Sequence, residues 1–117
     1  MSRLSVLLPD WRVMVECGVD TADGVKVPDV AAMPKERAQG YNRRLYSFPE
    51  APELCIEVAS PGNTPEELAE KRKLYFAAGC RECWIGSEPG ETAFYRATDQ
   101  SIAVSELCPR FPSQVEL

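Results

Sequence analysis

The chain has 117 residues, enough for one hydrophobic core, so we expect residues 1–117 to form a single domain. Hydrophobic residues make up 44% and charged residues 26%, a mixture that excludes wholesale disorder. The formal net charge of −5 argues against a protein that binds nucleic acid mainly through a basic surface. The sequence contains no histidine, which excludes triads, metal sites and general bases that need one.

The sequence shows no signal for a membrane or for export. No apolar run approaches the roughly 20 residues that a membrane-spanning helix needs. The N-terminus lacks the charged start, apolar stretch and small-residue cleavage site of a secretion signal. We therefore expect a cytoplasmic protein.

Two of the five cysteines, Cys80 and Cys83, form a CxxC pattern. An odd number of cysteines without a secretion signal predicts reduced thiols. A zinc site normally needs a second cysteine pair or histidines, and a thioredoxin-like pair opens a helix, whereas this pair follows one. We interpret these cysteines as packing residues, with a redox or adventitious metal role as the alternative.

The N-terminal half predicts a β-hairpin followed by a long connection. Residues 12–19 form an expected strand, Asp23-Gly24 an expected turn, and residues 25–32 the returning strand. Pro28 fits a strand start or edge, where its missing N–H is tolerated. Residues 34–52 are polar and rich in Gly, Asn and Pro, which predicts a long loop or a short irregular helix.

Residues 53–59 predict a strand in the centre of the sheet, because apolar residues occur on both of its faces. One face carries Leu54, Ile56 and Val58, and the other carries Cys55, Glu57 and Ala59.

A helix follows, with Thr64 as its N-cap, Pro65 at its first position and Glu67 completing a capping box. It should run to about Ala78 and end at Gly79. Residues 82–86 then predict a second buried strand, so the segment reads as a right-handed βαβ crossover with parallel strands.

The C-terminal third predicts a closing hairpin, formed by residues 92–97 and 101–107 with Asp99-Gln100 at the turn. Residues 109–117 should form a short docking tail.

Three polar residues stand out in these elements. Glu57 lies in a central strand, where a carboxylate is costly unless it is paired, protonated or bound to a metal. Asp29 lies just inside a strand, and Lys71 lies at the margin of the helix face that contacts the core, whereas Lys73 points away. Each has an ordinary explanation: a structural ion pair for Glu57, an edge residue for Asp29, and a surface lysine or a pair with Glu67 for Lys71.

Together, two carboxylates and a lysine suit phosphate chemistry. Mg²⁺ prefers carboxylate oxygens and keeps several waters, and it can activate a water and neutralise charge on a phosphate. A lysine nearby can orient that water and stabilise the negative charge.

The segments that contain these residues resemble the Uma-two family of the PD-(D/E)xK, restriction-endonuclease-like superfamily. The resemblance rests on VPDV at residues 27–30, APELCIEVASPGNT at 51–64 and EELAEKRKLYFAAGCRECWI at 66–85, and it covers roughly residues 11–112.

The resemblance implies an α/β fold with a mixed β-sheet, a βαβ crossover and flanking helices. It implies Asp29 and Glu57 as Mg²⁺ ligands (Mn²⁺ as a substitute), with the main-chain carbonyl of Val58 as a further ligand. The usual superfamily lysine would lie at residue 59, which is Ala, and Lys71 takes that role in this family's pattern. These implications predict an endonuclease that hydrolyses DNA phosphodiester bonds.

The sequence also departs from the family pattern. The N-terminal helix and strand that usually precede the PD strand are expected to be missing, which would expose apolar sheet surface and favour a homo-oligomer. Gly86-Ser87 replaces an expected Asp. The alternative function is a catalytically inactive nuclease-fold module for protein interaction or nucleic-acid binding. The Arg43-Arg44 pair and the run 71–73 are candidate phosphate contacts or plain solvated surface.

Overall fold

The computed structural model describes residues 2–41, 47–87 and 90–113. Its helices are α1 (Ser2–Leu7), α2 (Lys35–Ala38) and α3 (Pro65–Ala77), with a 3₁₀ turn η1 (Ala97–Asp99). Its strands are β1 (Trp11–Val15), β2 (Gly18–Thr21), β3 (Gly24–Lys26), β4 (Val30–Pro34), β5 (Ser47–Phe48), β6 (Leu54–Val58), β7 (Glu82–Ser87), β8 (Glu91–Arg96) and β9 (Gln100–Ile102). None of the helices in the described residues is long and apolar enough to cross a membrane.

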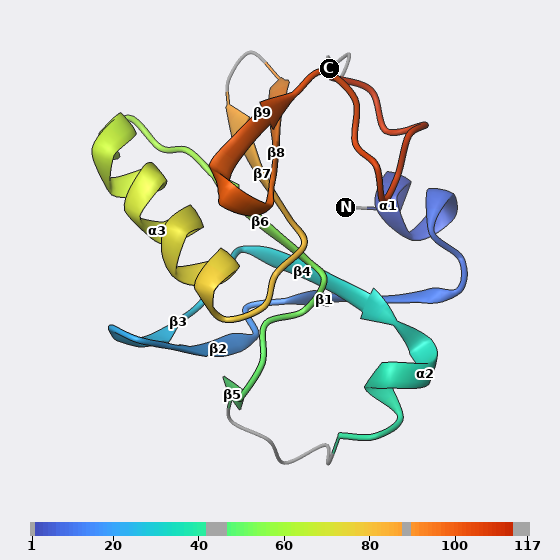
Figure 1. Ribbon diagram of the computed structural model, residues 1–117. Helices are drawn as coiled ribbons and strands as arrows, with labels where there is room; N and C mark the ends of the chain where they lie inside the picture. The colour runs from blue at the N-terminus through green and yellow to red at the C-terminus, as the bar shows by residue number, and fades with distance from the viewer. Residues whose placement is uncertain (1, 42–46, 88–89, 114–117) are drawn as a thin grey trace.

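The larger sheet has the strand order β1-β4-β6-β7-β8-β9, and a smaller sheet has the order β3-β2-β5. Strand β6 is central, as predicted, and pairs in parallel with β7, while its pairing with β4 is antiparallel. Helix α3 connects β6 to β7, which confirms the βαβ crossover (Figure 1). The result is the mixed sheet that the sequence predicted.

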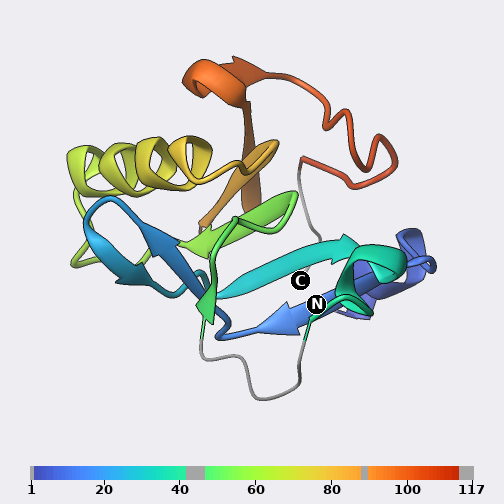
Figure 2. The ribbon, with the colours of Figure 1, turned by 60° about the horizontal axis from the view of Figure 1, so that its bottom comes forward.

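Each face of the larger sheet carries its own apolar cluster. On one face, Leu54 and Ile56 of β6 pack with Trp84 of β7, Leu4 of α1 and Phe111 of the C-terminal segment. On the other face lie buried residues from β2, β6, β7, α3 and the segments next to them, namely Val19, Ala51, Cys55, Tyr75, Cys80 and Cys83. Figures 1 and 2 show α3 and the β2–β3 hairpin together on one side, away from α1. Because successive side chains of β6 point to opposite faces of the sheet, this strand contributes to two cores, one toward α1 and the other toward α3.

The start and end of α3 follow its sequence signals. The Thr64 Oγ1 accepts a hydrogen bond from the Glu67 N–H at 3.1 Å, and Pro65 occupies the first turn. Such an N-cap contributes about 1 kcal/mol. Gly79 follows the helix with φ +108°, a conformation that glycine adopts without strain. These signals confirm the predicted helix and fix where its side chains lie over β6.

The predicted strand 12–19 is wrong in one respect, because the chain turns in its middle. Glu16 has φ +52°, which ends β1 and directs β2 into the smaller sheet. The returning strand 25–32 is likewise divided into β3 and β4 around Pro28. The Asp23-Gly24 turn is confirmed, with Thr21 opposite Gly24. Asp29 consequently lies in the bend before β4 and not inside a strand.

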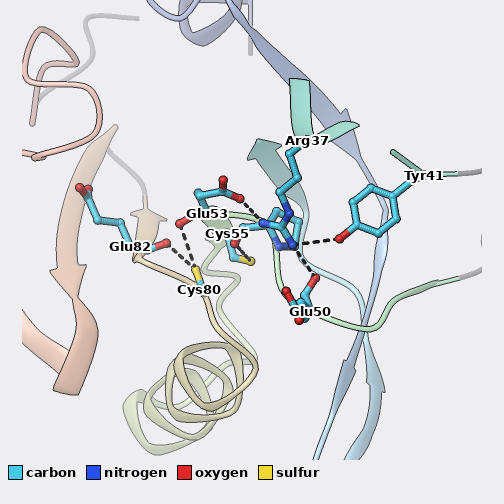
Figure 3. Close-up of polar contacts among 8 residues, drawn as sticks. Arg37, Tyr41, Glu50, Glu53, Cys55, Cys80 and Glu82 are labelled. Atoms are coloured by element: carbon cyan, nitrogen blue, oxygen red, sulfur yellow. Dashed lines mark hydrogen bonds and ion pairs between the residues drawn. The ribbon is translucent and has the colours of Figure 1, made fainter. Parts of the chain in front are cut away.

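The connection between β4 and β6 contains the short helix α2 and the two-residue strand β5, in partial agreement with the expected loop or irregular helix. Arg37 of α2 forms an ion pair with Glu53 and donates to the Glu50 carbonyl and the Tyr41 hydroxyl, both at 3.2 Å (Figure 3). These contacts fasten α2 to the residues that lead into β6.

Helix α1 occupies a place that the sequence analysis expected to be empty. A helix and a strand, α1 and β1, do precede Asp29. Leu4 of α1 and Leu8, which follows the helix, are buried in the core. The sheet face that we expected to be exposed is thus covered in part. The prediction of a homo-oligomer loses this argument and stays a prediction.

The C-terminal hairpin has a shorter second strand than expected, since β9 covers Gln100–Ile102 and not residues 101–107. The chain leaves the sheet after β9, and the residues that follow are held by a buried carboxylate.

That carboxylate belongs to Glu82, which is 2% exposed and accepts three hydrogen bonds. Its Oε1 accepts from Trp84 Nε1 at 2.9 Å and Ser105 Oγ at 2.6 Å, and its Oε2 accepts from the Leu107 N–H at 2.7 Å. Ser105 Oγ in turn accepts from the Cys108 N–H at 2.9 Å. The tail that contains Phe111 is therefore attached to β7 by polar groups as well as by packing, which agrees with the predicted docking for the described residues 109–113.

We expect Glu82→Gln to lower the free energy of unfolding by about 2 kcal/mol, because the new amide group would point its N–H at a backbone donor. Equilibrium urea denaturation measures the change, with Glu106→Gln as the exposed control. Equal stability of the two variants would contradict this account of Glu82.

Candidate active site

Asp29 and Glu57 lie at the same end of the larger sheet because β4 and β6 run antiparallel. The register pairs Val30 with Ile56, so the residue before β4 comes close to the last residues of β6. The Asp29 Oδ2 accepts a hydrogen bond from the Val58 N–H at 2.7 Å. Asp29 is exposed, and its carbonyl accepts from the Glu16 N–H at 3.4 Å. The carboxylate of Asp29 is thus held beside β6 at an exposed position.

Glu57 is buried, and its two carboxylate oxygens have different neighbours. The Tyr75 hydroxyl donates to Oε1 at 2.6 Å, and Lys71 Nζ lies 3.6 Å from Oε2. The Glu57 side chain is 7% exposed, whereas that of Lys71 is 38% exposed. The carboxylate is therefore held between the sheet and α3, close to the surface but largely withdrawn from water.

The helical positions explain why these two α3 residues reach Glu57. Lys71 and Tyr75 are four residues apart and so lie on the same side of α3. Lys73 is exposed on another side of the helix, as the helical geometry predicted. Tyr75 is a buried core aromatic, and its hydroxyl also contacts Glu57 directly.

The main-chain carbonyl of Val58 points toward the same place. The Ala59 N–H donates to the Gly86 carbonyl of β7, so the alternate residue Val58 directs its backbone groups toward β4. Continuing the β4–β6 register by two residues would place Pro28 opposite Val58. Proline has no N–H to donate, so the ladder cannot satisfy this carbonyl.

The charge state of Glu57 reflects opposing effects. Burial raises the pKa of Glu57 and the nearby Asp29 carboxylate adds to the rise, whereas the Tyr75 hydrogen bond and the Lys71 charge act to lower it. Burial, together with donation to Glu57, also raises the pKa of Tyr75, so its hydroxyl keeps its proton and remains a donor. A positive charge at this position would favour the ionised form of Glu57.

The donor set suits a hard divalent cation with several waters. Within residues 2–41, 47–87 and 90–113, no three Asp, Glu, Cys or His side chains are grouped to hold a metal ion. Two carboxylates and one carbonyl are nevertheless an ordinary protein contribution for Mg²⁺, which usually retains several waters. A Zn²⁺ site, by contrast, would need nitrogen or sulfur ligands that this end of the sheet does not offer.

The loop between β6 and α3 is held by Asn63. Its Oδ1 accepts from both the N–H and the Oγ of Ser60 at 2.9 Å. This turn fixes the short path from Glu57 to the helix that supplies Lys71.

One other candidate from the sequence, Arg72, does not join this group. Within the run 71–73, Arg72 donates to Asp99 from Nε at 2.6 Å and its guanidinium lies 3.8 Å from the centre of the Tyr95 ring. These contacts engage Arg72 in attaching α3 to η1, so it is not a free phosphate contact. Arg43-Arg44 lies outside the described residues.

The cysteines of the CxxC pattern belong to the core beneath α3. Cys80 Sγ donates to the Glu82 carbonyl at 2.9 Å and lies 3.4 Å from the Glu53 carbonyl (Figure 3). Its distance to Cys83 Sγ is 3.8 Å, and both residues are buried as free thiols. Both side chains lie in the buried cluster between α3 and the sheet, which agrees with the interpretation as packing residues.

We expect Glu57→Gln to stabilise the metal-free protein by about 1 kcal/mol at pH 8 and to have little effect near pH 4. The raised pKa means that the native chain holds this proton more tightly than the unfolded chain, so ionising Glu57 costs stability as the pH rises above the ordinary glutamic acid value. Urea denaturation in EDTA at both pH values measures the difference, with exposed Glu70→Gln as the control. A loss of stability at pH 8 would show instead that Tyr75 and Lys71 outweigh the burial cost.

A family model named Uma2 and described as "Putative restriction endonuclease" matches residues 2–112. A comparison with curated proteins found no match. Among solved structures, the chain is similar to a protein from Anabaena variabilis ATCC 29413, described as a "putative nuclease belonging to DUF820", with a TM-score of 0.72 and 18% identity.

That structural match covers 90% of this chain and 62% of the other, so the chain spans less than two thirds of its structural relative. At this identity the likeness shows the fold alone, a restriction-endonuclease-like α/β arrangement around a mixed sheet. The match of the family model over nearly the whole sequence shows that the chain belongs to the Uma2 family.

Proposed function

We propose that this protein is a Mg²⁺-dependent endonuclease that hydrolyses phosphodiester bonds in DNA. Membership of a family described as restriction endonucleases supports a nuclease role. The observation that carries the finer proposal is the meeting of Asp29, Glu57 and Lys71 at one end of β6. A buried carboxylate whose pKa is raised, as that of Glu57 is, is typical of functional sites.

In this proposal, Asp29 and Glu57 hold the metal ion together with the Val58 carbonyl. The hydrogen bond from the Val58 N–H fixes Asp29, so the carboxylate keeps its orientation at the sheet edge. Mg²⁺, when bound, supplies activation of a water and neutralises charge on the phosphate. The acidic net charge of the chain does not oppose this activity, since a bound cation dominates the local field.

Lys71 has a separate role that does not need metal contact. Its ammonium lies beside Glu57 on a side chain that is partly exposed, so it can turn from the carboxylate toward a phosphate. There it would orient the attacking water and stabilise the negative charge that develops during in-line displacement. Because α3 supplies this lysine, residue 59, where the superfamily usually has its lysine, can be Ala.

We expect the wild-type protein to bind Mn²⁺ and cleave plasmid DNA, and Asp29→Ala and Glu57→Ala to lose both properties, because each removes a charged ligand of one shared site. Calorimetric Mn²⁺ titration and gel analysis of plasmid in Mg²⁺ or Mn²⁺ measure the two effects, with exposed Glu70→Ala as the control.

Unchanged cleavage by the Glu57→Ala protein would refute the assignment. Metal binding without cleavage, combined with retained affinity for DNA or a protein, would favour the alternative of an inactive nuclease-fold module. If the wild-type protein binds no metal ion, the proposal of a metal-dependent endonuclease is wrong.

We expect Lys71→Met to lower kcat by about 100-fold or more, the usual cost of removing one group that stabilises transition-state charge. Mn²⁺ affinity should stay equal or rise, because the lost ammonium no longer opposes a cation beside Glu57. Single-turnover cleavage and Mn²⁺ titration separate these effects, and Lys73→Met is the matched control on the same helix. Equal activity of the two variants would exclude Lys71 from the chemistry.

A further inference from the structure

The hydrogen bond between Tyr75 and Glu57 joins a residue of the buried core to the candidate metal site. Tyr75 is 1% exposed and packs with Val19, Cys55 and Cys83 between α3 and the sheet. Its hydroxyl lies at the end of this cluster and donates to Glu57 Oε1 at 2.6 Å. Packing in the core therefore accounts for the Tyr75 ring. The hydroxyl, by contrast, serves as a hydrogen-bond donor to the Glu57 carboxylate.

This contact makes the two oxygens of Glu57 unequal. Oε1 accepts a short hydrogen bond from a donor that cannot move away, because the surrounding side chains hold the Tyr75 ring. Oε2 lies toward the half-buried Lys71, whose flexible side chain can withdraw. A cation that replaces the ammonium would consequently find Oε2 without a fixed donor, whereas one lone pair of Oε1 is already used and its direction is set by Tyr75.

The number of oxygens that a carboxylate offers discriminates between cations. Mg²⁺ and Mn²⁺ are accommodated by single carboxylate oxygens in an octahedral arrangement that keeps several waters. Ca²⁺ is larger, takes six to eight oxygens and often binds both oxygens of one carboxylate. A Glu57 restricted to Oε2 favours the smaller ions, whereas an unrestricted Glu57 could rotate to present both oxygens.

We propose that Tyr75 is a positioning residue that holds Glu57 as a one-oxygen ligand and so makes the site prefer Mg²⁺ and Mn²⁺ to Ca²⁺. The inference rests on the proposed function, since it presumes a cation at Asp29 and Glu57. It assigns the Tyr75 hydroxyl a role in metal selectivity, separate from the role of the ring in the core.

The test compares Mn²⁺ and Ca²⁺ affinities, by calorimetric titration and by competition, in wild type, Tyr75→Phe and Glu57→Ala. Tyr75→Phe keeps the ring and removes only the hydroxyl. Tyr95→Phe is the matched control, because this ring packs on Arg72 of α3, which is engaged by Asp99 and not by Glu57. Thermal unfolding of each variant is recorded, so that affinities are compared well below the midpoint. If Tyr75→Phe does not fold, Tyr75→Met fills the space without a hydroxyl.

For Tyr75→Phe we expect Mn²⁺ affinity to fall about tenfold, as is common when a group that orients a metal ligand is removed. Ca²⁺ affinity should stay nearly unchanged, so the preference for Mn²⁺ over Ca²⁺ decreases by about the same factor. A merely structural tyrosine would change the unfolding midpoint and leave this ratio unchanged.

An unchanged ratio in Tyr75→Phe, with binding abolished in Glu57→Ala, would overturn the inference about Tyr75 and leave the proposed site intact. Binding that persists unaltered in Glu57→Ala, or no binding in the wild type, would overturn the proposed function and the selectivity role with it.

Discussion

The burial of one carboxylate, that of Glu57, constrains the whole arrangement around the site. A carboxylate withdrawn from water needs donors or positive charge nearby, and the donors here come from a different layer of the molecule. Tyr75 and Lys71 reach Glu57 only if α3 crosses the sheet at one position and with one rotation about its axis. The N-cap at Thr64 and the short turn held by Asn63 fix that position from the sequence immediately after β6.

The same constraint connects stability with function. Burial raises the pKa of Glu57, which means that its ionised form carries a cost in the folded protein. Contacts with Tyr75 and Lys71 offset part of that cost, and a cation shared with Asp29 would offset more. By contrast, the equally buried Glu82 accepts three hydrogen bonds and serves to hold the C-terminal segment. The two carboxylates differ in their surroundings. Glu82 is enclosed by fixed hydrogen-bond donors, whereas Glu57 lies beside the exposed Asp29 carboxylate and the flexible Lys71 side chain.

Much of the fold could be predicted from local sequence signals. The elements from β6 to β7 were predicted well because each carries an unambiguous marker: apolar residues on both strand faces, the Thr64 cap and Gly79 at the helix end. The meeting of Asp29, Glu57 and Lys71 followed from a resemblance to known sequences, together with helical geometry that distinguished Lys71 from Lys73. The direct contact of Tyr75 with Glu57 was not predicted, because it depends on how far α3 lies from β6.

The two errors in the N-terminal hairpin have a common physical cause, which is that a break within a predicted strand leaves little trace in the sequence. Residues 12–19 read as one strand, yet Glu16 adopts a left-handed conformation that is uncommon for Glu, and the chain changes sheets there. Pro28 was recognised as a poor ladder residue, but its effect was larger than expected: it separates β3 from β4 and leaves Asp29 in a bend. That bend is what allows the Asp29 side chain to take the place of a ladder partner and accept from the Val58 N–H.

The position of the lysine has a wider consequence for this fold. A lysine at residue 59 would extend from the same strand as Glu57, so its distance from the carboxylate would be set by the strand geometry alone. In this chain Ala59 occupies that place, its N–H is bonded to Gly86, and the positive charge arrives from α3. The distance between acid and base then depends on packing between helix and sheet, through Tyr75 and the cysteines beneath it. Substitutions in that buried layer, without any contact to substrate, should therefore alter the geometry at Glu57 as directly as changes at the surface of the site.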